Sequence, residues 1–101
     1  MRDPTDLIGN EAEAQLEEQE AQRQRLQELD DYKWLMGHKQ GRRLVRQWLA
    51  DAGVYRNPFN HSGSVTAFNC GQLNAGQRLL AKVMEFAPEA YLVLLKEHAN
   101  E

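Results

Sequence analysis

Asp31-Tyr-Lys-Trp-Leu-Met-Gly-His-Lys-Gln-Gly-Arg-Arg-Leu-Val-Arg-Gln-Trp-Leu-Ala-Asp-Ala-Gly53 is the stretch that decides the predicted fold. Its apolar and small residues recur at steps of three and four, which is typical of an amphipathic helix. The predicted packing face, widened by Val45 and Leu49, consists of Trp34, Gly37, Gly41, Leu44, Trp48 and Ala52. Glycine costs about 1 kcal/mol against alanine inside a helix, so the two glycines indicate that another helix or backbone approaches closely.

The two tryptophans represent a large apolar surface for a chain of this size. We therefore expect both in the core, where Trp48→Ala would lower the free energy of unfolding by about 3–5 kcal/mol.

Cationic residues of the same stretch form a second face, here called the basic ridge. Its members are Lys33, Lys39, Arg42, Arg43 and Arg46, with His38 among them. Such a surface fits phosphate contacts with a nucleic acid or contacts with another anionic partner. It fits equally a solvated helix face, or a face that docks the chain's own acidic N-terminal helix. As a surface feature, it predicts that charge reversal at Arg42 and Arg46 weakens partner binding and leaves folding intact.

A helix-turn-helix interpretation of the basic ridge is weak. That motif requires a short turn and a recognition helix soon afterwards. Here a loop of about ten residues follows the basic helix, and the next predicted helix is nearly neutral.

Charge is divided unevenly along the 101 residues, a length that supports one compact domain. Residues 1–31 carry three basic and ten acidic residues, a net charge of −7, whereas residues 32–101 carry nine basic and five acidic, a net charge of +4. This polarity concerns interaction surfaces rather than the fold. No stretch approaches the ~20 apolar residues of a membrane span, and a signal peptide is not expected. A single cysteine excludes an internal disulfide and suits a reducing compartment.

The N-terminal third is predicted to differ from the rest. Residues 1–9 read as a flexible lead, and residues 10–30 are rich in the helix-forming Ala, Glu, Gln, Arg and Leu. Their apolar positions are too sparse for a heptad seam, so we expect a solvated, protruding acidic helix that gains order on a partner. That helix either continues into the tryptophan stretch or gives way to a new one capped by Asp30 or Asp31. The predicted organisation is residues 1–30, lead and acidic helix, and residues 31–101, a small packed helical module.

Beyond Gly53, which suits the left-handed position after a helix, the pattern predicts a loop and two helices. Tyr55 and Phe59 in the loop are expected to fold back onto the core. Thr66 or Asn69 is expected to cap a helix whose inner side carries Leu73, Gly76, Leu79, Leu80, Val83 and Met84. Gly76 is expected to permit close packing, whereas Gly71 supports no choice between packing and a helix start.

Pro88 suits the first turn of the last helix, predicted over residues 89–98. Its inward residues are expected to be Tyr91, Leu92 and Leu95. Nothing alternates with period two, so the predicted class is all-α with three to four helices.

Catalytic and metal chemistry find little support. His38, His61 and His98 are far apart and have no zinc spacing, and Cys70 reads as a small buried thiol rather than a nucleophile. No glycine-rich phosphate loop follows a strand. We therefore expect no catalytic residue, no metal site, no cofactor and no enzymatic activity.

Three segments carry a resemblance: Asp31-Tyr-Lys-Trp-Leu-Met-x-His-Lys-Gln-Gly-Arg-Arg-x-Val-x-Gln-Trp-Leu, then Gly-Val-Tyr-Arg, and later Phe-Asn-Cys-Gly-Gln-Leu-Asn-Ala-Gly-Gln-Arg-Leu-Leu. Across roughly Asp30 to Lys96 the chain resembles a family of small tailed-bacteriophage proteins, largely of short-tailed phages, encoded among head, packaging and tail genes. The resemblance implies a virion component, an assembly factor, or an internal protein carried or ejected with the genome. It places the chain in the virion or the host cytoplasm.

The function predicted from residues and resemblance together is that of a non-enzymatic phage structural or assembly protein acting through helix-mediated contacts. Expected partners are other phage structural proteins and further copies of the chain, with packaged DNA as a further candidate. The alternative is a nucleic-acid-binding protein that uses Lys39, Arg42, Arg43 and Arg46.

Overall fold

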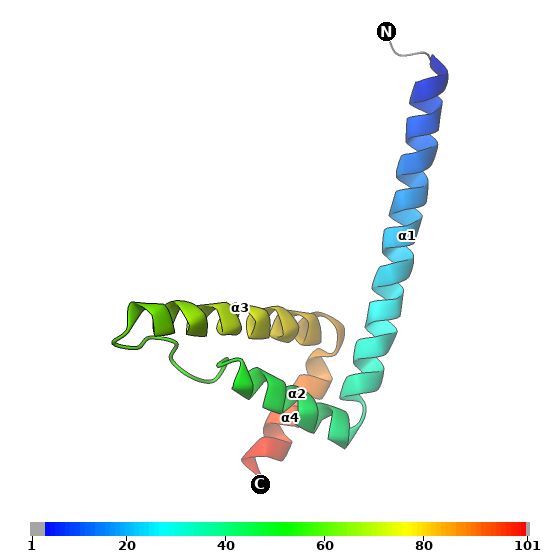
Figure 1. Ribbon diagram of the computed structural model, residues 1–101. Helices are drawn as coiled ribbons and strands as arrows, with labels where there is room; N and C mark the ends of the chain where they lie inside the picture. Colours follow the sequence, from blue (N-terminus) through cyan, green and yellow to red (C-terminus); the bar gives the residue numbers. More distant parts are fainter. Residues whose placement is uncertain (1–3, 101) are drawn as a thin grey trace.

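The computed structural model describes the backbone of residues 4–100 and the side chains of residues 9–100. That part of the chain forms four α-helices and no strand (Figure 1). The helices are α1 (Pro4–Met36), α2 (Lys39–Asp51), α3 (Gly63–Phe86) and α4 (Pro88–Ala99). The predicted all-α class is confirmed.

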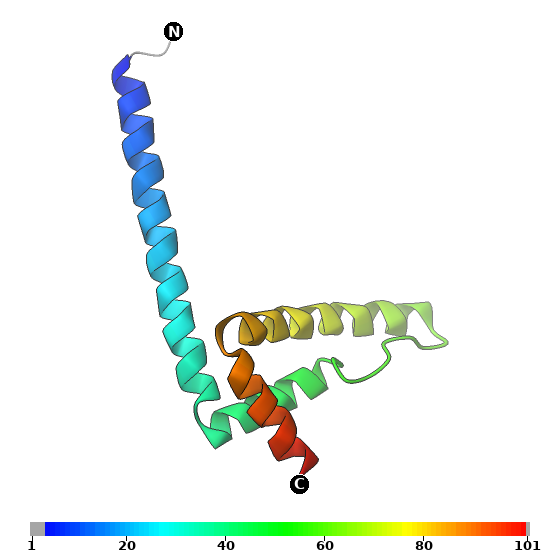
Figure 2. The same cartoon turned by 180° about the vertical axis from the view of Figure 1, so that it is seen from behind.

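Helix α1 is one unbroken helix that projects from the rest of the molecule (Figures 1 and 2). It passes through Asp30 and Asp31 without a cap, so the continuous alternative is the correct one. A flexible lead is wrong for residues 4–9, which are helical from Pro4 onward, and residues 1–3 lie outside the described residues. The side chains of residues 9–27 are all exposed, although Arg25 among them reaches another helix, α3. The division into units at residue 31 remains a prediction.

The tryptophan stretch is not one helix, because α1 ends at Met36 and α2 begins at Lys39. The amide of Gly37 donates to the carbonyl of Trp34 at 3.2 Å, and His38 then adopts an extended backbone with φ −117° and ψ 139°. The Nδ1 atom of His38 lies 2.7 Å from the same Trp34 carbonyl oxygen and must donate, since a carbonyl oxygen only accepts. Together these bonds satisfy a carbonyl that the helix end leaves unpaired.

The predicted close approach of another helix is present at Gly41 but not at Gly37, whose nearest atoms belong to the preceding turn of α1. A Cβ atom at Gly41 would overlap the carbonyl oxygen of Leu35, so only glycine lets α2 cross the end of α1 at this spacing. A Cβ at Gly37 would lie 2.8 Å from the carbonyl oxygen of Lys33.

The core lies where the four helices meet. Its buried cluster consists of Met36, Val45, Leu49, Val83, Ala87 and Leu94. Met36 closes α1, Val45 and Leu49 are the inner residues of α2, and Val83 and Leu94 come from the last two helices. This set is small for a chain of 101 residues.

The prediction that both tryptophans belong to the core is wrong. Trp34 is 68% exposed and Trp48 is 46% exposed, while Leu44 is also exposed. The break at Gly37 and His38 turns α2 away from the axis of α1, so the stripe no longer forms one surface. Val45 and Leu49, which lie at the edge of the predicted face, are the residues of α2 that are buried in the core.

The connection between α2 and α3 begins at Gly53, whose φ of 88° confirms the left-handed position. Ser62 caps α3, since its Oγ atom accepts from the amide of Val65. Capping by Thr66 or Asn69 is therefore wrong. Both side chains bind the loop instead: Thr66 Oγ1 accepts from the amide of Asn60 at 2.8 Å, and Asn69 Nδ2 donates to the Pro58 carbonyl at 3.1 Å.

Helix α3 meets α2 at Gly76, as predicted. A Cβ there would lie 2.5 Å from Cβ of Ala52 and 2.8 Å from Cγ2 of Val54. Val83 is buried as expected, whereas Met84 is exposed. Gly71 has open space around it, so it supports no packing role.

Pro88 begins α4 as predicted, but the predicted inner face is mostly wrong. Leu94 is buried and Tyr91 is half-buried, whereas Leu92 and Leu95 are exposed. The loop aromatics also differ from expectation, because Phe59 is exposed and Tyr55 covers only part of α2.

The molecule is extended rather than spherical, because α1 and α3 project from the core in different directions (Figure 1). Its radius of gyration is 20.0 Å, and its principal extents are 63 × 38 × 15 Å. A compact domain of about 100 residues has a radius of gyration of about 13 Å. Contacts that hold α1 to the end of α3 include the stacked rings of Tyr32 and Phe86, with centroids 5.6 Å apart, and the ion pairs Lys82–Glu28 and Arg25–Glu85.

Candidate functional site

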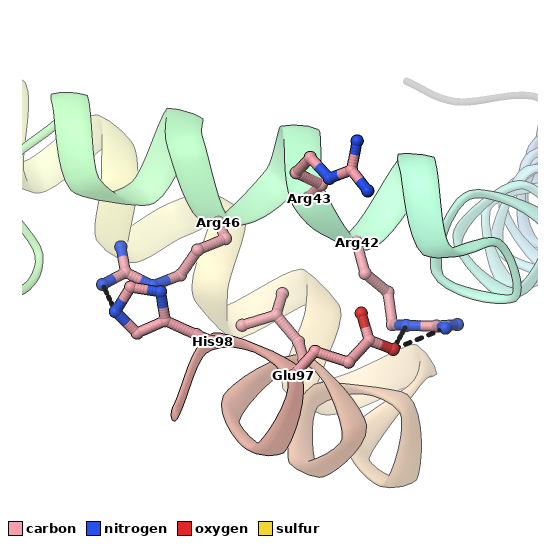
Figure 3. A pocket seen from close by; sticks show the side chains of 6 residues that line it. Arg42, Arg43, Arg46, Glu97 and His98 are labelled. Atoms are coloured by element: carbon pink, nitrogen blue, oxygen red, sulfur yellow. Dashed lines mark hydrogen bonds and ion pairs between the residues drawn. The ribbon is translucent and has the colours of Figure 1, made fainter. Parts of the chain in front are cut away.

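The basic ridge is divided by the fold into bound and free residues. Lys33 lies in the last turn of α1, His38 precedes α2, and the other members lie on α2. Figure 3 shows Arg42 and Arg46 directed toward α4, and Arg43 directed away from Glu97 and His98. The ridge is therefore not one continuous solvent-facing surface.

Arg42 forms a structural ion pair that joins three helices. Its Nε atom donates to Glu97 Oε1 of α4 at 2.8 Å, and a second guanidinium nitrogen lies 2.7 Å from the same oxygen. Nη1 donates to the main-chain carbonyl of Met36 at 2.8 Å. The side chains of Arg42 and Glu97 are only 15% and 25% exposed. Arg42 thus satisfies a carbonyl at the C-terminus of α1, where a cation is also electrostatically favoured.

Arg46 is also engaged within the chain. Its Nη2 atom lies 3.0 Å from Nε2 of His98 in α4, and its guanidinium carbon lies 4.0 Å from the ring centroid of Tyr55. Arginine only donates, so Nε2 of His98 is the acceptor in this contact. The hydroxyl groups of Tyr55 and Tyr91 are 3.3 Å apart, which links the loop to α4.

The space between α2 and α4 is too small for a substrate. A cavity of about 40 Å³ is lined by Arg42, Arg43, Arg46, Leu94, Glu97 and His98. This volume holds a water molecule or two rather than an organic ligand. The polar side chains of this cluster therefore join α2 to α4.

Three cations of the ridge stay available to a partner. Lys33, Lys39 and Arg43 are exposed and form no ion pair with any residue that the structure describes. Arg42 and Arg46, by contrast, are engaged within the chain, and a binding role for them remains a prediction. A binding role for the other three remains a prediction as well.

Exposed apolar residues are the more prominent surface feature. Trp34 on α1, Leu44 and Trp48 on α2, Phe59 in the loop, and Phe68 on α3 all have large solvent-exposed areas. The ring of Trp34 lies beside His38, with centroids 5.1 Å apart, at the outer corner between α1 and α2. Exposed tryptophan is unusual on a monomer and frequent at the centres of protein interfaces.

Among the described residues, no group of three or more His, Cys, Asp or Glu side chains could hold a metal ion. Cys70 is exposed on α3 and not buried as predicted. Within the same residues, no helix is long and apolar enough to cross a membrane.

Sequence reasoning missed Glu97 and His98 as partners of the ridge, and Tyr91 as the partner of Tyr55. They lie on α4, more than thirty residues beyond α2, and no sequence spacing relates the two helices. The available signal was the run of polar residues Lys-Glu-His at the end of an otherwise apolar helix.

Comparison with known proteins shows that residues 32–96 match the model of a phage protein family. It belongs to the Bbp19-like phage protein family. The match begins at Tyr32 and covers the last turn of α1, all of α2 and α3, and most of α4. No curated protein and no solved structure shows significant similarity to the chain.

Proposed function

We propose that this protein is a non-enzymatic virion structural or assembly protein of a bacteriophage that acts through helix-mediated protein contacts. The observation that supports this proposal is the large accessible surface area of the chain. The accessible surface is 7887 Å². A compact monomer of this mass exposes about 5,800 Å². The accessible surface of this chain is therefore roughly 2,000 Å² larger than that of a compact monomer.

The size of this excess supports a binding role. Specific protein interfaces bury about 800 Å² on each partner, and obligate assemblies bury more. The excess comes from the projecting parts of α1 and α3, which touch little else (Figures 1 and 2). These helices gain neighbours only when another molecule lies beside them.

The chemical character of the surface supports the same proposal. Trp34, Phe68 and Leu92 are each more than half exposed. Interface centres are enriched in aromatic residues and depleted in charge. Membership of a phage family supports the setting, the virion or the host cytoplasm, with head, portal, tail or ejected components as partners.

Nucleic-acid binding is the alternative, and it rests on Lys33, Lys39 and Arg43. Since Arg42 and Arg46 are engaged by Glu97 and His98, at most these three ridge cations neutralise phosphates. Binding through about three phosphates is weak and falls steeply with salt.

The deciding experiment measures the mass of the full chain by light scattering, and its binding to purified virions and procapsids, each at low and high salt. Saturable binding to particles, or a defined oligomer, that persists at high salt supports the proposal, since apolar contacts tolerate salt. A monomer that binds no particle but binds duplex DNA only at low salt overturns it. Lys39→Glu with Arg43→Glu is the matched variant: it should abolish DNA binding and leave an apolar interface unchanged.

A further inference from the structure

Helix α4 is apolar on two opposite faces. Leu94 is buried in the core at 2% exposure, whereas Leu92 on the other side is 58% exposed and Leu95 is 39% exposed. A helix that is hydrophobic all round belongs in a buried position. In Figure 2, α4 crosses in front of α2, and no described element covers its outer side.

The exposed side of α4 has the spacing of a helix-pairing seam. Its residues occur at steps of four, three and four: Pro88, Leu92, Leu95 and Ala99. All four are exposed. Apolar residues at this spacing form the contact line between two paired helices. At 1.5 Å per residue the seam is about 16 Å long, which matches a second helix of the same length.

Charged residues beside the seam indicate which helix would cover it. Glu89 and Lys96 flank the seam on the same side, one heptad apart, and neither forms an ion pair with a described residue. If two copies of α4 pair antiparallel, Leu92 faces Leu95 of the second copy. Glu89 then lies near Lys96 of the second copy, and the symmetry repeats this contact. A parallel pair would not bring these two residues together, because the flanks that carry them would then lie on opposite sides of the pair.

We infer that α4 is a self-pairing surface, on which a second copy of this chain docks its own α4 antiparallel about a two-fold axis between Leu92 and Leu95. The inference deepens the proposed function, on which it rests, because it names a second copy as one partner. A two-fold contact needs only one self-complementary surface. The α4 seam supplies apolar residues at its centre and opposite charges at its rim.

The test is sedimentation equilibrium on the full chain and on the charge-reversal variants Glu89→Lys and Lys96→Glu. The unmodified chain is expected to dimerise. Each variant alone places like charges together at both contacts, and is expected to weaken the dimer about tenfold. An equimolar mixture of the two variants restores both opposite-charge contacts, so it is expected to dimerise about as tightly as the unmodified chain.

The mixture also separates pairing from folding, since a folding defect in either variant is not repaired by mixing. A mixture that associates no better than its components overturns the inference, and so does an unmodified chain that is monomeric throughout. Leu92→Ser and Leu16→Ser form a second matched pair of exposed leucines. Loss of the dimer with the first variant only supports α4 pairing.

Failure of this inference is distinguishable from failure of the proposed function. An oligomer that dissociates with Leu16→Ser and not with Leu92→Ser overturns α4 pairing and retains an assembly role through α1. Salt-resistant binding to purified particles by a monomeric chain likewise overturns α4 pairing and retains an assembly role for the protein. Absence of both self-association and particle binding overturns the two together.

Discussion

The guanidinium group of Arg42 donates to the main-chain carbonyl of Met36 across 2.8 Å, so a side chain of α2 closes the end of α1. The same guanidinium binds the carboxylate of Glu97. One arginine thereby ties the end of the projecting helix to α2 and α4. The orientation of α1 depends on this contact, on the Tyr32–Phe86 stack and on the ion pairs that join α1 to α3.

Arg42→Ala is therefore expected to destabilise the fold, contrary to the sequence-based expectation that Arg42 is a surface charge. The change leaves Glu97 and a helix-terminal carbonyl without their partner and should lower the free energy of unfolding by about 2 kcal/mol. Urea denaturation followed by circular dichroism measures this. Arg43→Ala, one residue along and exposed, is the control and should change the value by less than about 0.5 kcal/mol. Equal effects would show that the Arg42–Glu97 pair contributes nothing.

Two helical glycines should respond to alanine with opposite sign. Gly41→Ala forces a Cβ atom against the Leu35 carbonyl and should cost about 2 kcal/mol despite the better helix propensity of alanine. Gly71→Ala meets open space and should stabilise the chain by up to about 1 kcal/mol. Thermal unfolding of both variants is the measurement. A stabilised Gly41→Ala variant would refute the close contact between α1 and α2.

Neighbouring apolar residues on α2 should differ in their contribution to stability. Leu49 is fully buried, so Leu49→Ala should lower the free energy of unfolding by about 3 kcal/mol. Trp48 is nearly half exposed, so Trp48→Ala should cost only about 1–2 kcal/mol in the protomer, less than a core position implies. Denaturant unfolding at low protein concentration compares them. A larger loss for Trp48→Ala would place the core on the tryptophan face after all.

Stability should decline at alkaline pH in a way that depends on Tyr55. Burial, and then the hydrogen bond to Tyr91, raise the pKa of Tyr55 well above its ordinary value of 10.0, against a smaller opposite influence of Arg46. Because the folded chain holds this proton more tightly than the unfolded chain, its stabilising effect is complete below pH about 10 and is lost as pH rises further.

Denaturation across a pH series should therefore show a steeper alkaline loss of stability for the unmodified chain than for Tyr55→Phe. The variant lacks the titrating hydroxyl group and retains Tyr91 and Tyr32 as internal references. Identical slopes would mean that the Tyr55 hydroxyl ionises in the folded chain as readily as in the unfolded one.

Local features of the structure were predictable from the sequence where one residue type has a unique backbone property. Pro88 at the start of α4 and Gly53 after α2 follow from a fixed φ and from a positive φ. The helical class follows from periodicity, and the close approach at Gly41 and Gly76 follows from the cost of glycine in a helix.

The candidate site was predictable only in part. Sequence placed Lys33, Lys39 and Arg43 on the surface correctly, but it treated Arg42 and Arg46 in the same way. What distinguishes them is Glu97 and His98, which lie over fifty residues away and become neighbours only when α4 crosses α2.

The sequence by itself determined the helical class and the helix boundaries at Gly53 and Pro88, because these depend on each residue's own conformational preferences and near neighbours. Tertiary structure alone decided which face of each helix turns inward. The spacing from Trp34 to Trp48 persists across the break at His38, and α4 offers leucines on two faces, so periodicity cannot choose between them. That choice depends on the packing of Val45, Leu49, Val83 and Leu94 around Met36, where distant segments exclude water from one another.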